Sequence, residues 1–168
     1  MKNESTTQPT LASQTIPVEH IKISSERSFV EVRQRLEATL PKLDASIADA
    51  LRSGDHKRAT EFDENGPKLS IFEQRDHGSL LQIFGGRRNA LQYEIGNPLT
   101  SSKMNRYKLS AVLYAPLRVV LFEDERGKAV FEYDKPSSFF GQFDDKRVTK
   151  VGRDLDDELE AALRAAAD

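Results

Sequence analysis

The sequence predicts an α+β fold in a single domain, with about five to six strands, an N-terminal pair of helices and a long C-terminal helix. Two kinds of periodicity predict this class. Apolar residues alternate with polar ones in several short runs, and they recur at steps of three and four in longer runs. The 168 residues are enough for one hydrophobic core. We expect a polar, disordered tail over residues 1–17 and the single domain over residues 18–168.

The N-terminal part of the domain predicts a strand and then two helices. Residues 18–24 alternate as a strand does, and Ser28 with Glu31 forms a capping-box pattern at the start of the first helix. A second amphipathic helix follows, with Gly54 as its C-cap. The polar run 55–66 predicts an exposed loop.

The middle of the chain predicts two strands separated by turns and by one ambiguous segment. The segments are a strand at 69–75, the turn 76–78, the apolar run 79–84, the turn 85–89 and a strand at 90–95. The apolar run is short enough to fit either a strand or a short helix. The second turn carries two adjacent arginines, which we interpret as a solvated turn in preference to an anion site.

Helix and hairpin signals continue after residue 96. Asn97 is a good N-cap and Pro98 suits the first helical position, so a short helix is expected through Met104. Residues 117–123 and 128–134 predict a hairpin. Both faces of its first strand are mostly apolar, which indicates a central strand or a strand whose outer face meets a partner.

Two C-terminal segments complete the prediction. The phenylalanine-rich segment 137–143, with Phe139, Phe140 and Phe143, is interpreted as a lid packed on the core. The alternatives are a wall of an apolar pocket or part of a dimer interface. The final helix begins at Asp144 or Asp145 and has one apolar stripe. That stripe comprises Val148, Val151, Leu155, Leu159 and Leu163.

Composition argues against several functional classes. The 25 basic and 27 acidic residues are well mixed and form no basic stripe, so we expect no nucleic-acid partner. The chain has no cysteine, which excludes disulfides, cysteine nucleophiles and thiolate metal sites, and a cytoplasmic location is expected. No apolar run approaches the roughly 18 residues that span a bilayer, and we expect no membrane partner.

The best candidate site is the Asp76-His77 pair. A histidine with a pKa near neutrality can take or give a proton. Adjacent side chains of a strand point to opposite faces, so Glu94, on a neighbouring strand, is a better partner for His77 than Asp76 is. The alternative is structural: Asp76 caps a turn and His77 hydrogen-bonds to backbone.

A ligand-binding role draws on a wider set of residues. The candidate contacts are Asp76, His77, Tyr93, Asn97, Arg118 and Phe140. His77, Glu94 and His20 could converge on a metal ion, but no spacing demands it, and we predict no metal site. The sequence identifies no cofactor.

Several motifs together resemble domain of unknown function family 302, a small bacterial and archaeal family. They are Asp76-His77, Gly96-Asn97-Pro98, Ala115-Pro116-Leu117-Arg118, the Asp/Glu-Gly hairpin, Tyr133 with Pro136, and the closing amphipathic helix. The resemblance covers roughly residues 18–166. It implies a curved antiparallel sheet packed by helices and a tendency to dimerise, and it implies no established activity. The stretch from Asp44 to Lys68 is longer than the family's usual link.

These observations lead to three hypotheses for the function. The first is a dimeric, bacterial binding module for a small, partly apolar ligand. The second is an enzyme that uses His77 as general acid or base with Glu94. The third is a structural or protein-interaction domain. The absence of a recognisable nucleophile or cofactor loop favours the first.

Overall fold

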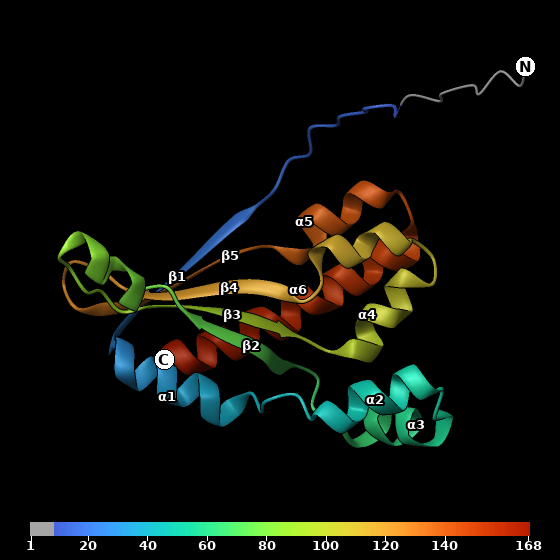
Figure 1. The fold of residues 1–168 in the computed structure, drawn as a ribbon, viewed down its shortest axis with the longest axis horizontal. Coiled ribbons are helices and arrows are strands. Elements are labelled where there is room, and N and C mark those ends of the chain that lie inside the picture. The colour runs from blue at the N-terminus through green and yellow to red at the C-terminus, as the bar shows by residue number, and fades with distance from the viewer. Residues whose placement is uncertain (1–8) are drawn as a thin grey trace, which may run out of the picture.

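The fold is built on one antiparallel sheet of five strands, seen in a computed structural model that describes residues 9–168 (Figure 1). Its order is β1-β5-β4-β3-β2, so the hairpin strand β4 is central, as predicted. The strands are β1 (His20–Ser28), β2 (Ser70–Asp76), β3 (Ala90–Gly96), β4 (Leu117–Glu123) and β5 (Lys128–Asp134). The α+β class and the five-stranded sheet are therefore confirmed.

The described residues also form six α-helices and three 3₁₀ helices. The α-helices are α1 (Phe29–Thr39), α2 (Ala45–Ser53), α3 (His56–Asn65), α4 (Pro98–Asn105), α5 (Pro136–Phe140) and α6 (Lys146–Ala167). The 3₁₀ helices are η1 (Ser79–Phe84), η2 (Leu109–Tyr114) and η3 (Gly141–Phe143). Helices α1 and α6 pack on one face of the sheet, whereas α2 and α3 pack on each other beyond its end (Figure 1).

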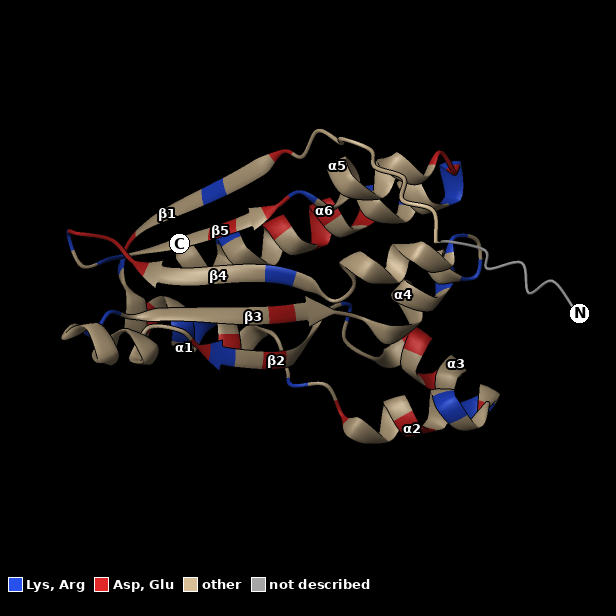
Figure 2. Cartoon of the chain, turned by 45° about the horizontal axis from the view of Figure 1, so that its top comes forward, with Lys and Arg blue, Asp and Glu red and all other residues tan. Residues whose placement is uncertain are grey.

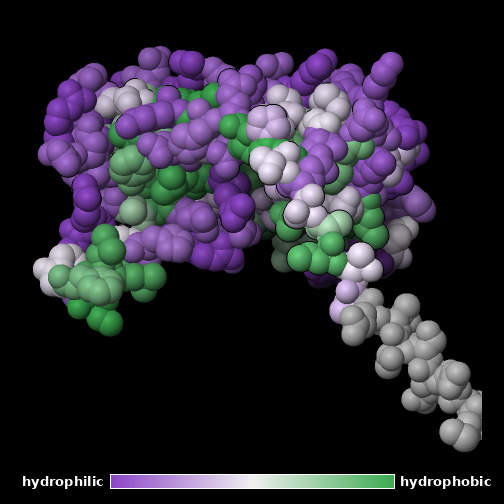
Figure 3. All heavy atoms as spheres, turned by 90° about the horizontal axis from the view of Figure 1, so that it is seen from above, coloured by the Kyte–Doolittle hydropathy of each residue, from purple (hydrophilic) through white to green (hydrophobic). Residues whose placement is uncertain are grey.

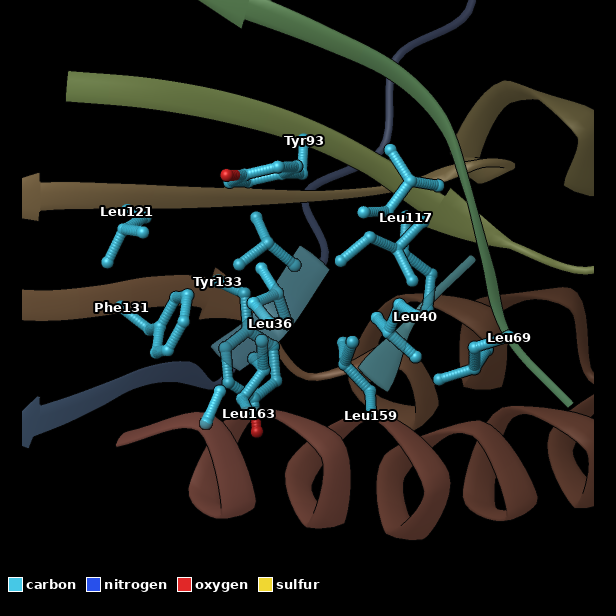
Figure 4. Packing of buried hydrophobic residues seen from close by; sticks show 14 of the residues in the cluster. Leu36, Leu40, Leu69, Tyr93, Leu117, Leu121, Phe131, Tyr133, Leu159 and Leu163 are labelled. Carbon is cyan, nitrogen blue, oxygen red and sulfur yellow. The ribbon is translucent and has the colours of Figure 1, made fainter. Parts of the chain in front are cut away.

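The hydrophobic core lies between the sheet and the helices α1 and α6. Leu36 of α1 and Leu163 of α6 meet Phe131 and Tyr133 of the sheet, as Figure 4 shows. All four side chains are buried. The long apolar stripe predicted for the final helix is the one that faces this core, and the Asp145 side chain caps the helix by accepting from the Arg147 N–H at 2.9 Å.

Local capping signals in the sequence correctly identified the start of α1 and the end of α2. Ser28 accepts from the Glu31 N–H, and Glu31 in turn accepts from the Ser28 N–H at 3.0 Å, so the capping box is present. Gly54 ends α2 with φ of +74°, a left-handed conformation that glycine adopts without strain.

The prediction of an exposed loop over residues 55–66 is wrong, because these residues form helix α3. The Asp55 carboxylate accepts from the Arg58 N–H at 3.0 Å and caps the helix. Phe62 is the only buried side chain of α3, so the apolar signal that marks a helix is nearly absent. The first strand is also longer than predicted, ending at Ser28 and not at residue 24.

The predicted disordered tail, residues 1–17, lies partly outside the described residues, which begin at residue 9. Residues 9–19 form neither helix nor strand, and Ile16 packs partly against the core. Basic and acidic residues are interspersed over the strands and helices (Figure 2). Among the described helices, none is long and apolar enough to cross a membrane.

Candidate functional site

A cavity of about 200 Å³ lies where β3 runs into α4. Strands β2, β3 and β4 and helices α4, α5 and α6 all contribute residues to its wall. The lining residues are Phe72, Ile95, Gly96, Asn97, Pro98, Thr100, Ser101, Met104, Ala115, Pro116, Leu117, Phe140 and Leu155. Asn97 and Phe140, both expected as ligand contacts, are thus on the same cavity.

The Gly96-Asn97-Pro98 turn forms one side of this cavity. The Asn97 Oδ1 accepts from the N–H groups of Leu99 and Thr100, at 2.9 and 3.2 Å, and Pro98 occupies the first turn of α4. The Asn97 Nδ2 donates to the Pro67 carbonyl at 3.1 Å. Asn97 therefore holds the strand-to-helix turn in place, and most of its hydrogen-bonding capacity is used within the protein.

The phenylalanine-rich segment contributes Phe140 to the wall of the cavity. Phe140 is fully buried, and the ring of Phe139 stacks on Tyr114 with centroids 4.9 Å apart. Gly152 lets α6 approach α5 closely, because a Cβ there would lie 3.1 Å from the Phe140 Cβ and from the Ser137 Cα. The segment is packed on the core, as predicted, and Phe140 also lines the cavity.

Every lining side chain is apolar or neutral. The polar ones are Asn97, Thr100 and Ser101. The Ser101 Oγ accepts from the Asn105 Nδ2 at 3.0 Å, and its own hydroxyl hydrogen donates to no other described residue. The cavity can therefore offer a ligand an apolar surface with one or two hydroxyl groups, and it has no side chain that titrates near neutral pH.

His77 lies at the other end of the sheet from this cavity. Its backbone N–H donates to the Ala90 carbonyl at 3.1 Å, and its side chain is exposed. The neighbouring Asp76 carboxylate accepts from the Ser79 N–H at 2.9 Å, which lowers the pKa of Asp76 below its ordinary value. Asp76 thus caps the start of η1, in agreement with the structural alternative.

Glu94 is bound elsewhere. Its carboxylate accepts from the Arg75 guanidinium at 2.6 Å. Asp76 pairs with Leu91 and His77 lies opposite Ala90, so Glu94 is four residues, roughly 13 Å, further along the strand from His77. The structure does not bring His77 and Glu94 within hydrogen-bonding distance.

Tyr93 and Arg118 lie on opposite faces of the sheet. The Tyr93 hydroxyl donates to the Glu37 Oε1 at 2.9 Å, on the core side, and burial together with this carboxylate raises the Tyr93 pKa. Tyr93 is drawn with its ring in the core in Figure 4. Arg118 is exposed on the open face of β4. Neither residue lines the cavity between β3 and α4.

His20 lies on the edge strand β1, at the corner of the sheet diagonal to His77. Its Nδ1 is 2.9 Å from an Asp134 oxygen and its Nε2 is 3.3 Å from a Glu132 oxygen. The hydrogen bonds to Asp134 and Glu132, in that order, raise its pKa. Within residues 9–168, no group of three or more potential metal-ligating side chains is present.

Several cavity residues had no signal in the sequence as site residues. Phe72, Met104 and Leu155 come from three separate elements and are the kind of apolar residue that ordinarily fills a core. Their proximity to the Gly96-Asn97-Pro98 turn could have identified them. That proximity can be known only once the pairing register of β2, β3 and β4 is known.

The fold and this cavity define a small single-sheet α+β protein with an apolar pocket at one end of the sheet. A family model described as "Domain of unknown function DUF302" matches residues 58–166, and the chain belongs to this family. The family assignment from the sequence is confirmed. The match begins inside α3, so it leaves out residues 18–57 that the sequence resemblance included.

A solved structure has a similar fold. It is the crystal structure of an uncharacterized conserved DUF302 protein from Bacillus stearothermophilus, with a TM-score of 0.64 and 16% sequence identity. The superposition covers 88% of this chain and 97% of that one. At this identity the similarity shows the fold alone. No curated protein matches the chain.

Proposed function

We propose that this protein is a binding module that holds a small, neutral, mostly apolar ligand in the cavity between β3, α4 and α5. The observation that carries the proposal is the wall of this cavity, which is apolar apart from Asn97, Thr100 and Ser101. Burying a charged ligand group without an opposite charge is costly, so a neutral ligand is favoured.

The volume limits the size of the ligand. An apolar cavity of about 150 Å³ can hold benzene, whereas the pockets that bind drug-sized molecules have volumes of roughly 300–1,000 Å³. The cavity here, at about 200 Å³, suits a single ring or a short branched chain. The hydroxyl groups of Thr100 and Ser101 would pair with one polar group of that ligand.

Three probes of nearly equal shape test the proposal: benzyl alcohol, benzoate and benzylamine. Amide NMR shifts report binding at α4. We expect benzyl alcohol to shift the amides of Thr100 and Ser101, and the two charged probes to bind at least tenfold more weakly. Equal binding of benzoate would contradict the neutral class. No shift at α4 with any probe would contradict the proposal as a whole.

A matched pair of variants locates the binding. Ala115→Leu places a larger side chain in the cavity wall and should abolish the shifts. Ala161→Leu makes the same change on the exposed face of α6 and should leave them unaltered. Binding that survives Ala115→Leu would place the ligand elsewhere.

The homodimer expected from the sequence stays a prediction, together with the cytoplasmic location and the bacterial origin. Phe139 and Phe140 are buried within the chain and are not available as its interface. We expect a second copy to pack on η2, where Leu109, Val112 and Leu113 are exposed. Light scattering after size-exclusion chromatography of Leu113→Glu checks this, because a dimer through η2 should become a monomer.

A further inference from the structure

The 3₁₀ helix η1 is an apolar projection with none of its residues buried. Leu80, Ile83 and Phe84 are 65%, 83% and 86% exposed, and Leu81 is 38% exposed. Figure 3 shows this segment as a hydrophobic knob that stands out from a largely polar body at the left-hand end. Large apolar side chains grouped in this way on a small protein mark a surface that meets a partner.

The residues on either side of η1 are hydrogen-bonded to each other, where β2 ends and β3 begins. The N–H groups of His77 and Gly78 both donate to the Ala90 carbonyl, at 3.1 and 3.0 Å. A Cβ at Gly78 would lie 1.9 Å from the Arg88 carbonyl oxygen, so only glycine allows the two chain segments that flank η1 to approach this closely. The apolar residues are thus carried outward on an ordered support.

Two cations adjoin the knob. Arg87 and Arg88 follow η1 after two glycines, and both are exposed. Neither forms an ion pair within 4.0 Å with another described residue, whereas Arg75 on the adjacent strand is paired with Glu94 at 2.6 Å. An exposed apolar tip beside unpaired arginines has the composition of a segment that enters the interface of an anionic bilayer.

We propose that η1 binds the surface of an anionic lipid bilayer, with Ile83 and Phe84 entering the acyl boundary and Arg87 and Arg88 at the headgroups. The shape and the charge favour a bilayer over a protein partner, because a convex tip offers little area for a flat interface. A helix that spans the membrane is not required. This proposal goes beyond the ligand-binding function, and it differs from the sequence-based expectation of no membrane partner, which was based on the lack of a spanning segment.

The first test uses the full chain and vesicles of phosphatidylcholine with or without phosphatidylglycerol. The chain has no tryptophan, so Phe84→Trp gives a single reporter at the tip. We expect a blue shift of its emission with the anionic vesicles and little change with the neutral ones. An unshifted emission with anionic vesicles, or an equal shift with both kinds, would overturn the proposal.

Co-sedimentation of variants with the anionic vesicles tests the two parts of the surface. The double change Arg87→Ser with Arg88→Ser should weaken binding by about 25-fold, since each surface arginine contributes about fivefold. The double change Ile83→Ser with Phe84→Ser should weaken it at least as much. All four positions are exposed, so folding should be retained, which circular dichroism checks.

The matched control is Leu11→Ser with Val30→Ser, which removes exposed apolar side chains outside η1 and outside the expected dimer surface on η2. Vesicle binding should be unchanged in this control. An equal loss in the control, or no loss in the η1 variants, would overturn the proposal. Light scattering gives a further test. If the unaltered chain binds no vesicles and Ile83→Ser with Phe84→Ser converts a dimer into a monomer, η1 is an interface between copies and the proposal is overturned.

Discussion

The segments η1 and α5 are both short helices rich in large apolar side chains, yet α5 is buried and η1 is exposed. Phe139 and Phe140 of α5 pack on Tyr114 and against α6, where Gly152 allows a close approach. Ile83 and Phe84 of η1 have no such neighbour and are more than four-fifths exposed. Apolar content therefore does not decide whether a segment joins the core; the element that packs against it does.

The largest expected difference between the two segments is in the free energy of unfolding when a phenylalanine of each is changed to alanine. Phe140→Ala should lower the free energy of unfolding by about 3–5 kcal/mol, because it empties part of a fully buried site. Phe84→Ala should change it by no more than about 0.5 kcal/mol. Urea unfolding followed by circular dichroism measures both. Similar losses in the two variants would mean that η1 is packed in solution.

A second prediction concerns the close contact of Gly78 with Arg88, which joins the two chain segments that flank η1. Gly78→Ala should destabilise the protein by about 1–3 kcal/mol, because its Cβ would collide with the Arg88 carbonyl and force the backbone to move. Gly86→Ala is the control, since a Cβ there has no heavy atom within 4 Å. Thermal and urea unfolding of the two variants check the difference; an unchanged Gly78→Ala would show that the base of η1 is loose.

A third prediction tests the neighbour that keeps α5 buried. Tyr114→Leu removes the stacking on Phe139 and the edge contacts with Phe140 and Phe143. We expect a loss of about 1 kcal/mol of unfolding free energy. Val30→Ala, at an exposed position on α1, serves as the control and should be nearly neutral. If Tyr114→Leu leaves the free energy of unfolding unchanged, packing against α6 alone keeps α5 buried.

The smallest effect is expected from the cap of η1 at low pH. The Ser79 N–H holds the folded-state pKa of Asp76 below its ordinary value of 3.8. A carboxyl whose pKa is lowered on folding stabilises the fold above the unfolded pKa, and this contribution is lost as the pH falls through the folded pKa. The Ser79 amide proton shift should therefore titrate with a midpoint below 3.8, and Asp76→Asn should abolish the titration.

The elements that the sequence predicted well are those with local signals. The hairpin strands 117–123 and 128–134, the capping box at Ser28 and the cap at Asn97 all depend on residues a few positions apart. Helix α3 escaped prediction because it is a charged helix with a single buried side chain, Phe62. Local patterns thus give the elements, and they fail where tertiary packing provides most of the stability.

The candidate site shows the same division. Asn97 and Phe140 were identified because a turn motif and a phenylalanine cluster are visible in the sequence. The ion pair of Glu94 with Arg75 was not, because the irregular β2–β3 register decides which side chains are neighbours. The choice between a buried and an exposed apolar segment likewise requires knowledge of what lies beside it.

The sheet order also has a consequence for how the protein is made. Strand β1 pairs with β5, and His20 is 114 residues away from its partner Asp134. On the ribosome, β1 emerges long before the strand that it needs, so its backbone groups and the apolar stripe of α1 stay uncovered until the hairpin has been synthesised. Sheet closure is then a late, long-range step, and the nascent chain is a natural client for chaperones during that interval.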